Sequence, residues 1–262
     1  MTDAPARRIP PPAFLSDPGL RAVLAALPDA RIVGGAVRDA LAGRSVADID
    51  LATPHPPDQI TAALTAAGIR AIPTGLDHGT VTALPAGRGF EITTLRRDIE
   101  TDGRHARVAF TNDWREDAAR RDFTINAMSM TADGAVFDYF GGLADLHAGQ
   151  VRFVGDPSAR IAEDYLRILR FFRFFARYAA GPPDPGSVAA IRQAVLGLAA
   201  LSVERVWSEL RRILLAPDPT GAIALMAELG VLAAVIPEGA DPARLAPLTA
   251  APPIRSCASP RC

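Results

Sequence analysis

The stretch that decides the fold is RIVGGAVRDALAGRSVADID, residues 31–50. Its β-branched Ile-Val pair predicts a short strand, Gly34 and Gly35 predict a tight turn, and the residues that follow have helical character. Paired glycines after a strand allow backbone N–H groups to approach a phosphate closely, and the helix N-terminus beyond them favours an anion. Arg38, one turn into that helix, is placed to bind a phosphate oxygen. A plain tight turn is the alternative, because the Walker and dinucleotide spacings are both missing.

The same stretch ends in two carboxylates, Asp48 and Asp50. Residues i and i+2 of a strand point to the same side, so the two side chains would be presented together. Hard oxygen ligands at this spacing suit Mg²⁺, whereas the alternative is the solvated edge of a loop. Glu91, alone among apolar and threonine residues in FEITTL (90–95), is a candidate third carboxylate. A salt bridge between Glu91 and an arginine is the rival interpretation.

A third segment, ARRDFTINA (119–127), sets Arg121 beside another arginine and an aspartate. Its functional interpretation is a charge-matched clamp for a triphosphate or for a base edge. The alternative is a helix end that carries surface arginines, and this segment taken alone favours that alternative.

A fourth segment, EDYLRILRFFRFFAR (163–177), places arginines along a helical ridge. In helical register Asp164 and Arg167 are neighbours at i, i+3, and Arg170 and Arg173 continue the ridge. An acid beside a forked cation presents acceptors and donors, and that combination can read the hydrogen-bonding edge of a base. The alternative is a salt-bridged helix face without a binding role.

Composition narrows the class of protein. The 262 residues carry 28 cations, all of them arginine, against 29 acids, for a net charge of −1. Near-zero charge excludes nucleic-acid binding by bulk charge alone, and 49% hydrophobic with 22% charged residues excludes a disordered chain. Both cysteines, Cys257 and Cys262, are in the last six residues, so a disulfide framework is excluded. Without a signal peptide or a spanning apolar stretch, we expect a cytoplasmic protein with no membrane partner.

The pattern along the chain predicts an α/β head followed by an all-helical part. Short β-rich runs alternate with helical pieces up to about residue 155, including a run at VRFVG (151–155), and helical periodicity dominates afterwards. Charge follows the same division. Residues 1–150 hold 15 arginines and 19 acids, and residues 151–215 hold 10 arginines and 6 acids. Helices are expected over 157–180, 187–200, 202–215 and 219–235.

Taken in order, these motifs resemble one family. GGAVRD, DID, RRDFTINA and EDYLRILRFFRF resemble the tRNA nucleotidyltransferase/poly(A) polymerase family, and more narrowly the bacterial CCA-adding enzymes with an EDxxR element. The resemblance runs from about Phe14 to about Val235. It implies a head of nucleotidyltransferase (polymerase-beta-like) fold and a helical neck and body. It also implies addition of C, C and A to the 3′ end of tRNA from CTP and ATP, without a nucleic-acid template.

The resemblance also implies residue roles. Asp48 and Asp50 match the ligands of Mg²⁺, and Glu91 matches the position of a third, assisting carboxylate. The positions that match contacts to the nucleotide, mainly to its triphosphate, are Gly34, Gly35, Arg38 and Arg121. Asp164 and Arg167 match the pair that reads the incoming base, and the pocket is completed by Arg170 and Arg173.

Family members are considerably longer than this chain, which sets expectations for its domains. We expect a catalytic head over 1–155, a base-recognising neck over 156–216, and the start of a helical body over 217–262 whose last 12 or so residues are irregular. The patternless end suggests a truncated or frame-shifted body. The alternatives to full CCA addition are therefore a poly(A) polymerase, an A-only or CC-only enzyme, and a nucleotide-binding fragment that turns over little tRNA. The segment 96–117, where the family has a mobile loop needed for the final A, disfavours CC-only addition.

Overall fold

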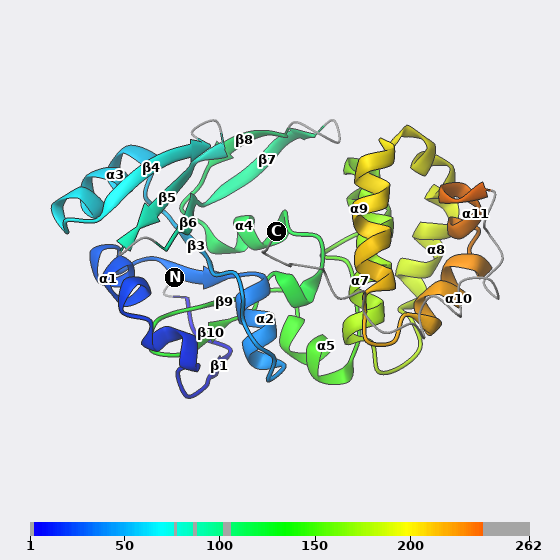
Figure 1. The fold of residues 1–262 in the computed structure, drawn as a ribbon, viewed down its shortest axis with the longest axis horizontal. Helices are drawn as coiled ribbons and strands as arrows, with labels where there is room; N and C mark the ends of the chain where they lie inside the picture. The colour runs from blue at the N-terminus through cyan, green and yellow to red at the C-terminus, as the bar shows by residue number, and fades with distance from the viewer. Residues whose placement is uncertain (1–2, 76–77, 86–87, 102–105, 238–262) are drawn as a thin grey trace, which may run out of the picture.

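The computed structural model describes residues 3–75, 78–85, 88–101 and 106–237, and it has two parts that lie side by side (Figure 1). One part is built on a β-sheet, and the other is entirely helical within the described residues. Cys257 and Cys262 lie outside these ranges. No helix in the described part of the chain is long and apolar enough to cross a membrane.

The head is organised by an eight-stranded mixed sheet of order β1-β10-β9-β2-β3-β6-β5-β4. Its neighbours pair antiparallel except for β3 and β6, which are parallel. The strands are β1 (Arg7–Arg8), β2 (Arg31–Val33), β3 (Asp50–Thr53), β4 (Arg70–Gly75), β5 (Thr80–Leu84), β6 (Phe90–Thr94), β9 (Ser129–Met130) and β10 (Ala135–Phe137). A separate antiparallel ribbon is formed by β7 (Arg96–Thr101) and β8 (Ala106–Phe110) and extends toward the helical part (Figure 1). The ribbon lies in the segment where the family loop is expected.

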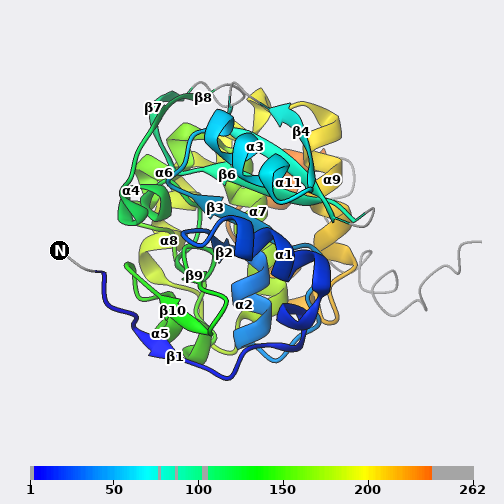
Figure 2. The ribbon, with the colours of Figure 1, turned by 90° about the vertical axis from the view of Figure 1, so that its left-hand side faces the viewer.

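Short helices cover the face of the sheet that is turned away from the helical part. In Figure 2, which looks onto that face, α1 and α3 lie in front of the strands. Local sequence explains the start of α1, because Pro18 occupies its first turn and the Asp17 carboxylate accepts the Leu20 N–H at 3.0 Å. The helices of the head are α1 (Pro18–Ala26), α2 (Gly35–Leu41), α3 (Pro57–Ala66), α4 (Trp114–Ala119) and α5 (Gly142–Ala148). The predicted strand–glycine–helix order at 31–41 is confirmed by β2 and α2.

The helical part follows the expected order, with two predicted helices divided and a third, predicted over 187–200, continuing from Val195 as a 3-10 helix. It contains α6 (Pro157–Glu163), α7 (Leu166–Tyr178), α8 (Pro185–Ala194), a 3-10 turn η5 (Val195–Ala200), α9 (Val203–Leu214), α10 (Thr220–Glu228) and α11 (Val231–Val235). The single helix predicted over 157–180 is wrong, because Asp164 is extended, with φ −158° and ψ 108°. The helix predicted over 219–235 is interrupted at Gly230, which has φ +76°. The predicted strand at VRFVG is replaced by one isolated bridge between Phe123 and Phe153.

The two parts share an aromatic core. Phe123 follows α4 and Phe153 precedes α6, and their ring centroids are 4.8 Å apart. Phe123 contacts Phe174 of α7 at 5.2 Å, and Phe153 stacks on Phe171 of the same helix at 6.0 Å. All of these rings belong to the hydrophobic cluster of the helical part. The core of the helices therefore reaches back into the chain well before residue 155.

This shared core predicts a large stability effect at Phe171, which is fully buried. We expect Phe171→Ala to lower the free energy of unfolding by about 3–5 kcal/mol, because it removes a ring and leaves a cavity. Leu196→Ala is the control, since Leu196 is 88% exposed, and should change stability by less than about 0.5 kcal/mol. Urea denaturation of both variants measures the difference, and equal small effects would contradict a shared core.

Candidate functional site

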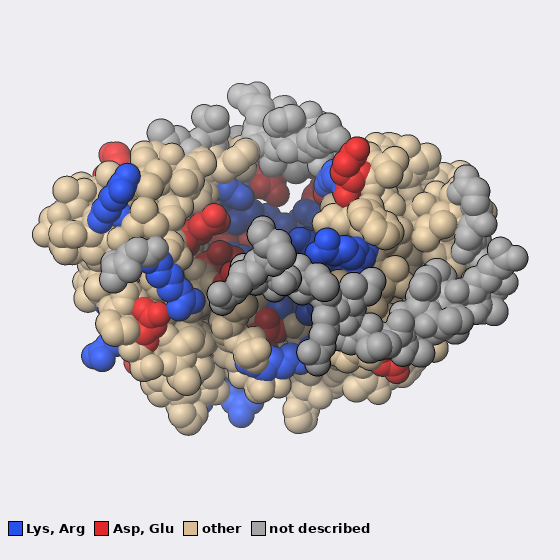
Figure 3. All heavy atoms as spheres, in the orientation of Figure 1, with Lys and Arg blue, Asp and Glu red and all other residues tan. Residues whose placement is uncertain are grey.

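A pocket of about 870 Å³ lies between the head and helices α7 and α9. Eight arginines and five aspartates line it, so its formal charge is +3. Figure 3 shows the arginines gathered in the hollow between the two parts, with acidic side chains on the head side. The structure brings ten of the predicted residues to this one pocket: Gly34, Gly35, Arg38, Asp48, Asp50, Arg121, Asp164, Arg167, Arg170 and Arg173. Glu91 lines an adjoining cavity of about 550 Å³, together with Asp48 and Asp50.

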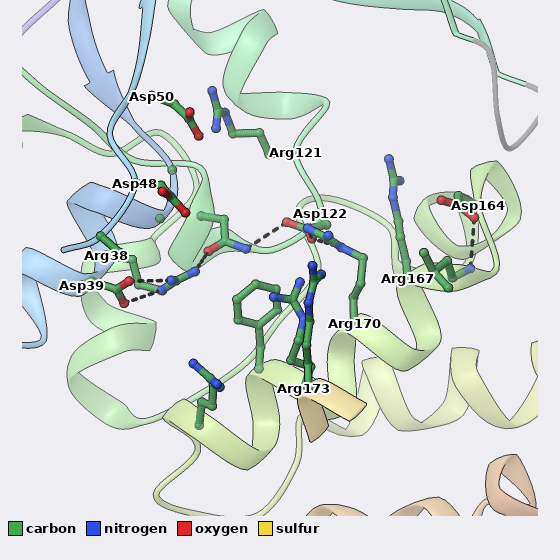
Figure 4. A pocket seen from close by; sticks show the side chains of 18 of the residues that line it. Arg38, Asp39, Asp48, Asp50, Arg121, Asp122, Asp164, Arg167, Arg170 and Arg173 are labelled. Atoms are coloured by element: carbon green, nitrogen blue, oxygen red, sulfur yellow. Dashed lines mark hydrogen bonds and ion pairs between the residues drawn. The ribbon is translucent and has the colours of Figure 1, made fainter. Parts of the chain in front are cut away.

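Asp48 and Asp50 are not brought together by the i, i+2 spacing of one strand that the sequence predicted. Strand β3 begins at Asp50, so Asp48 lies in the preceding loop and the strand spacing does not apply to the pair. Both nevertheless line the pocket (Figure 4). Parallel pairing aligns Asp50 with Glu91 on the neighbouring strand. Burial, reinforced by the charges of Glu91 and Asp48, raises the pKa of Asp50 against the opposing effect of Arg121.

This accumulation of negative charge fits a divalent cation. Within the described residues, no group of three or more His, Cys, Asp or Glu side chains is close enough to hold a metal ion. Two carboxylates suffice for Mg²⁺, which keeps several waters and takes further ligands from substrate phosphates. Asp48 and Asp50 supply the hard oxygen donors that such a site requires.

The glycine turn allows an arginine to approach the backbone closely. Gly34 has φ +67°, in the left-handed region that favours glycine, and a Cβ there would lie 3.0 Å from Nη1 of Arg121. Arg121 is held from behind by Asp117, whose Oδ2 accepts its Nη2–H at 3.1 Å. Burial pushes the pKa of Asp117 upward, but Arg121 and Arg120 outweigh it and hold that pKa below its usual value. Arg121 is thus fixed between the glycine turn and Asp50.

A chain of hydrogen bonds crosses from the head to α7 (Figure 4). Arg38 donates from Nη1 to Asn126 Oδ1 at 2.6 Å, and its Nε and Nη2 bind both oxygens of Asp39 at 3.0 and 2.9 Å. Asn126 donates to Asp122 Oδ1 at 3.0 Å, and Arg170 of α7 donates from Nε to Asp122 Oδ2 at 2.7 Å. Burial would raise the pKa of Asp122, but Arg170 and Asn126 outweigh it and lower that pKa. The buried carboxylate therefore remains charged and joins the two parts.

The shared helical register predicted for Asp164 and Arg167 is wrong. The break between α6 and α7 takes Asp164 out of helical register, and its Oδ2 pairs instead with Arg205 of α9 at 2.7 Å. Arg167 pairs with Glu163 and donates from Nη1 to the Arg160 carbonyl at 2.9 Å. Asp164 and Arg167 still line the same pocket (Figure 4), and each is held by its own ion-pair partner.

Helix α9 contributes residues to which no chemistry was assigned from sequence. Its Glu209 is buried and lies 2.7 Å from Arg173 Nε, as a close ion pair rather than an aligned hydrogen bond. Burial lowers the pKa of Arg173 to about 10. Arg205 and Arg212 of the same helix line the pocket. Their spacing at i, i+4 and i+7 with Glu209 puts all three on one helical face, which was the signal available in the sequence.

Comparison with known proteins agrees with this arrangement. Residues 30–152 match the family described as the poly A polymerase head domain, and residues 183–241 match the probable RNA and SrmB-binding site of polymerase A. The mitochondrial CCA tRNA nucleotidyltransferase 1 of Danio rerio is 50% identical over 204 residues, which cover 77% of this chain and 47% of the relative. The CCA-adding enzyme of Levilactobacillus brevis is 41% identical over 207 residues, covering 78% and 51%.

The chain belongs to the CCA-adding tRNA nucleotidyltransferase family. The Bacillus stearothermophilus CCA-adding enzyme, solved in complex with CTP, has a TM-score of 0.76 and 33% identity, and the match covers 89% of this chain and 58% of that one. The Thermotoga maritima enzyme, complexed with tRNA, has a TM-score of 0.66 and 27% identity, covering 80% and 48%. The predicted nucleotidyltransferase head with a helical neck is confirmed. The chain spans about half the length of the curated relatives it matches.

The buried charge of Asp122 predicts how stability depends on pH. Because its folded-state pKa is below the ordinary value, its charge stabilises the fold above about pH 4, and this contribution is lost as the pH falls further. Asp122→Asn should cost about 3 kcal/mol at pH 7, since it leaves Arg170 without its anion. The difference from wild type should shrink between about pH 5 and pH 2. Urea unfolding across that range checks this, and curves that stay parallel would show that charge is not the cause.

Proposed function

We propose that this chain adds C, C and A to the 3′ end of tRNA, taking the nucleotides from CTP and ATP without a nucleic-acid template. The observation that carries the proposal is the meeting of all four motif segments in one arginine-rich pocket beside Asp48 and Asp50. Relatives solved with CTP and with tRNA support the same substrates. The partners proposed for this chain are thus the tRNA 3′ end, CTP and ATP.

Asp48 and Asp50 are the proposed ligands of Mg²⁺, with Glu91 as the assisting carboxylate. Bound there, Mg²⁺ would lower the barrier to nucleotidyl transfer by charge stabilisation at the attacking hydroxyl and the leaving pyrophosphate. The protein's own contribution is positioning and neutralisation of charge, with no covalent enzyme intermediate. Gly34 and Gly35 leave backbone room for the triphosphate, and Arg38 and Arg121 bind its oxygens.

The base is proposed to be read by Asp164 and Arg167, with Arg170 and Arg173 completing the pocket wall. Asp164 would accept from the exocyclic amino group that C and A share, and Arg167 would donate to the neighbouring ring nitrogen. G and U present the opposite groups at these positions, so they would leave polar side chains unpaired, which is costly in a closed site. Since Arg205 and Glu163 hold the two side chains separately, each can be oriented independently of the other.

The finer expectations from the sequence belong to the same proposal. We propose a catalytic head over 1–155, a base-recognising neck over 156–216 and the beginning of a body over 217–262. A bacterial origin and a cytoplasmic location are also proposed. The relatives that support the family include mitochondrial and bacterial proteins, so either branch is compatible with family membership.

The metal-ligand role of Asp48 predicts a loss of activity without a loss of fold. Asp48→Ala should reduce CMP and AMP incorporation at least about a thousandfold, because the charge that holds Mg²⁺ is removed. Radiolabelled CTP and ATP, with tRNA lacking its 3′ end, measure incorporation, and product length separates CCA addition from a poly(A) tail. Asp58→Ala is the control, since Asp58 is exposed on α3. Activity of Asp48→Ala near the wild-type level would sink the metal assignment.

The main alternative is a nucleotide-binding fragment with little turnover, and the share of the relatives that the chain spans motivates it. Phosphate contacts dominate affinity for nucleic acids, so a chain with fewer of them should bind tRNA poorly. The fragment hypothesis predicts a Kd for CTP like that of a full enzyme but a tRNA Kd weaker by a factor of about 100. Titration of both ligands on one preparation decides the matter, because tight tRNA binding would exclude the fragment.

A further inference from the structure

Tyr178, the last residue of α7, contacts the head at the end of the helix far from Asp164 and Arg167. Two guanidinium groups contact its ring, with Cζ of Arg38 4.6 Å and Cζ of Arg44 4.5 Å from the ring centroid. Its hydroxyl donates a hydrogen bond to Oδ1 of Asp39. None of the sequence motifs assigned a role to Tyr178, and it does not line the main pocket.

Asp39 links that hydroxyl to the nucleotide side of the pocket. Its Oδ1 accepts from both Tyr178 and Arg38 Nε, and its Oδ2 accepts from Arg38 Nη2 at 2.9 Å. The direction of the Arg38 fork therefore depends on the rotamer of Asp39, which Tyr178 fixes. Both Arg38 and Asp39 line the main pocket.

A second contact joins the same end of α7 to the head. Arg44 donates from Nη2 to the carbonyl oxygen of Arg177 at 2.5 Å, where the partial negative charge at a helix C-terminus favours a cation. A separate cavity of about 310 Å³ borders Tyr178, Arg44 and Leu41. The ring therefore has free space on one side. The hydrogen bond of its hydroxyl and the guanidinium groups of Arg38 and Arg44 hold it in place.

We propose that Tyr178 is a positioning residue that sets the orientation of Arg38 toward the nucleotide triphosphate, through Asp39. The proposal rests on the proposed function, since Arg38 has no triphosphate to bind otherwise. Burial and the hydrogen bond to Asp39 raise the pKa of Tyr178, so the hydroxyl keeps its proton at neutral pH and donates. CTP and ATP share the triphosphate, whereas Asp164 and Arg167 at the other end of the helix segment face the base. Tyr178 should consequently affect affinity for both nucleotides equally and leave the choice of base alone.

Tyr178→Phe tests this proposal, because it removes the hydroxyl and keeps the ring with its contacts to Arg38 and Arg44. We expect KM and Kd for both CTP and ATP to rise roughly three- to tenfold, the net contribution of one typical hydrogen bond. The kcat, the ratio of C to A incorporation and the Tm should stay near the wild-type values. Tyr139→Phe is the matched control. Its hydroxyl also donates to a carboxylate, that of Asp3, but neither residue lines the pocket, so no constant should change.

A double-mutant cycle separates positioning from general stability. Asp39→Asn breaks the link between the hydroxyl and Arg38, so the double variant should bind CTP no more weakly than Asp39→Asn alone. Additive effects would overturn the proposal, as would an equal loss of kcat, Tm and tRNA affinity in Tyr178→Phe. Unchanged KM and Kd values for CTP and ATP in Tyr178→Phe would also overturn the proposal. An inactive wild-type chain would instead contradict the proposed function, while the Kd values for CTP would still decide the role of Tyr178.

Discussion

The arrangement of the two parts depends on one buried carboxylate. Asp122 is 8% exposed and accepts hydrogen bonds from Asn126, from Arg170 and from the Phe123 N–H. A buried charge without partners is costly, so Arg170 must reach Asp122 whenever the two parts are packed together. That contact restricts how α7 can rotate and slide along its axis, and it thereby helps to set which face of α7 lines the pocket. The aromatic contacts between Phe123 and Phe174 then fill the space around the ion pair.

The same logic explains how so many arginines share one pocket. Each of several pocket arginines has a carboxylate partner behind it: Asp117 for Arg121, Glu163 for Arg167, Asp39 for Arg38 and Glu209 for Arg173. These partners reduce the mutual repulsion of the guanidinium groups and fix their directions. Among the residues that line the pocket itself, arginines outnumber aspartates, and this excess favours a polyanion. A nucleotide that enters therefore meets donors that are already oriented, and fewer side chains have to be ordered on binding.

Sequence reasoning worked where the signal was local and failed where it was not. The strand, the glycine turn and the helix at 31–41 follow from neighbouring residues, and the order of the motifs predicted which segments meet in the pocket. The break at Asp164 was missed because apolar periodicity runs through it, from Ile161 to Ile168, as if the helix were continuous. The break is accompanied by a contact that apolar periodicity does not register, since the partner Arg205 lies on another helix. The pairing of β3 with β6 that aligns Asp50 with Glu91 is likewise a contact between distant strands.

The break between α6 and α7 has a consequence for how such a site can diverge. Asp164 does not only face the pocket, because its Oδ1 also accepts the Leu166 N–H at 3.0 Å and so completes the first turn of α7. A replacement must therefore both face the pocket and supply an acceptor for that backbone group, or the turn that carries Arg167 loosens. Short polar side chains meet both demands, and long or apolar ones meet neither. Substitution at this position is therefore confined to the few residue types that also begin helices well.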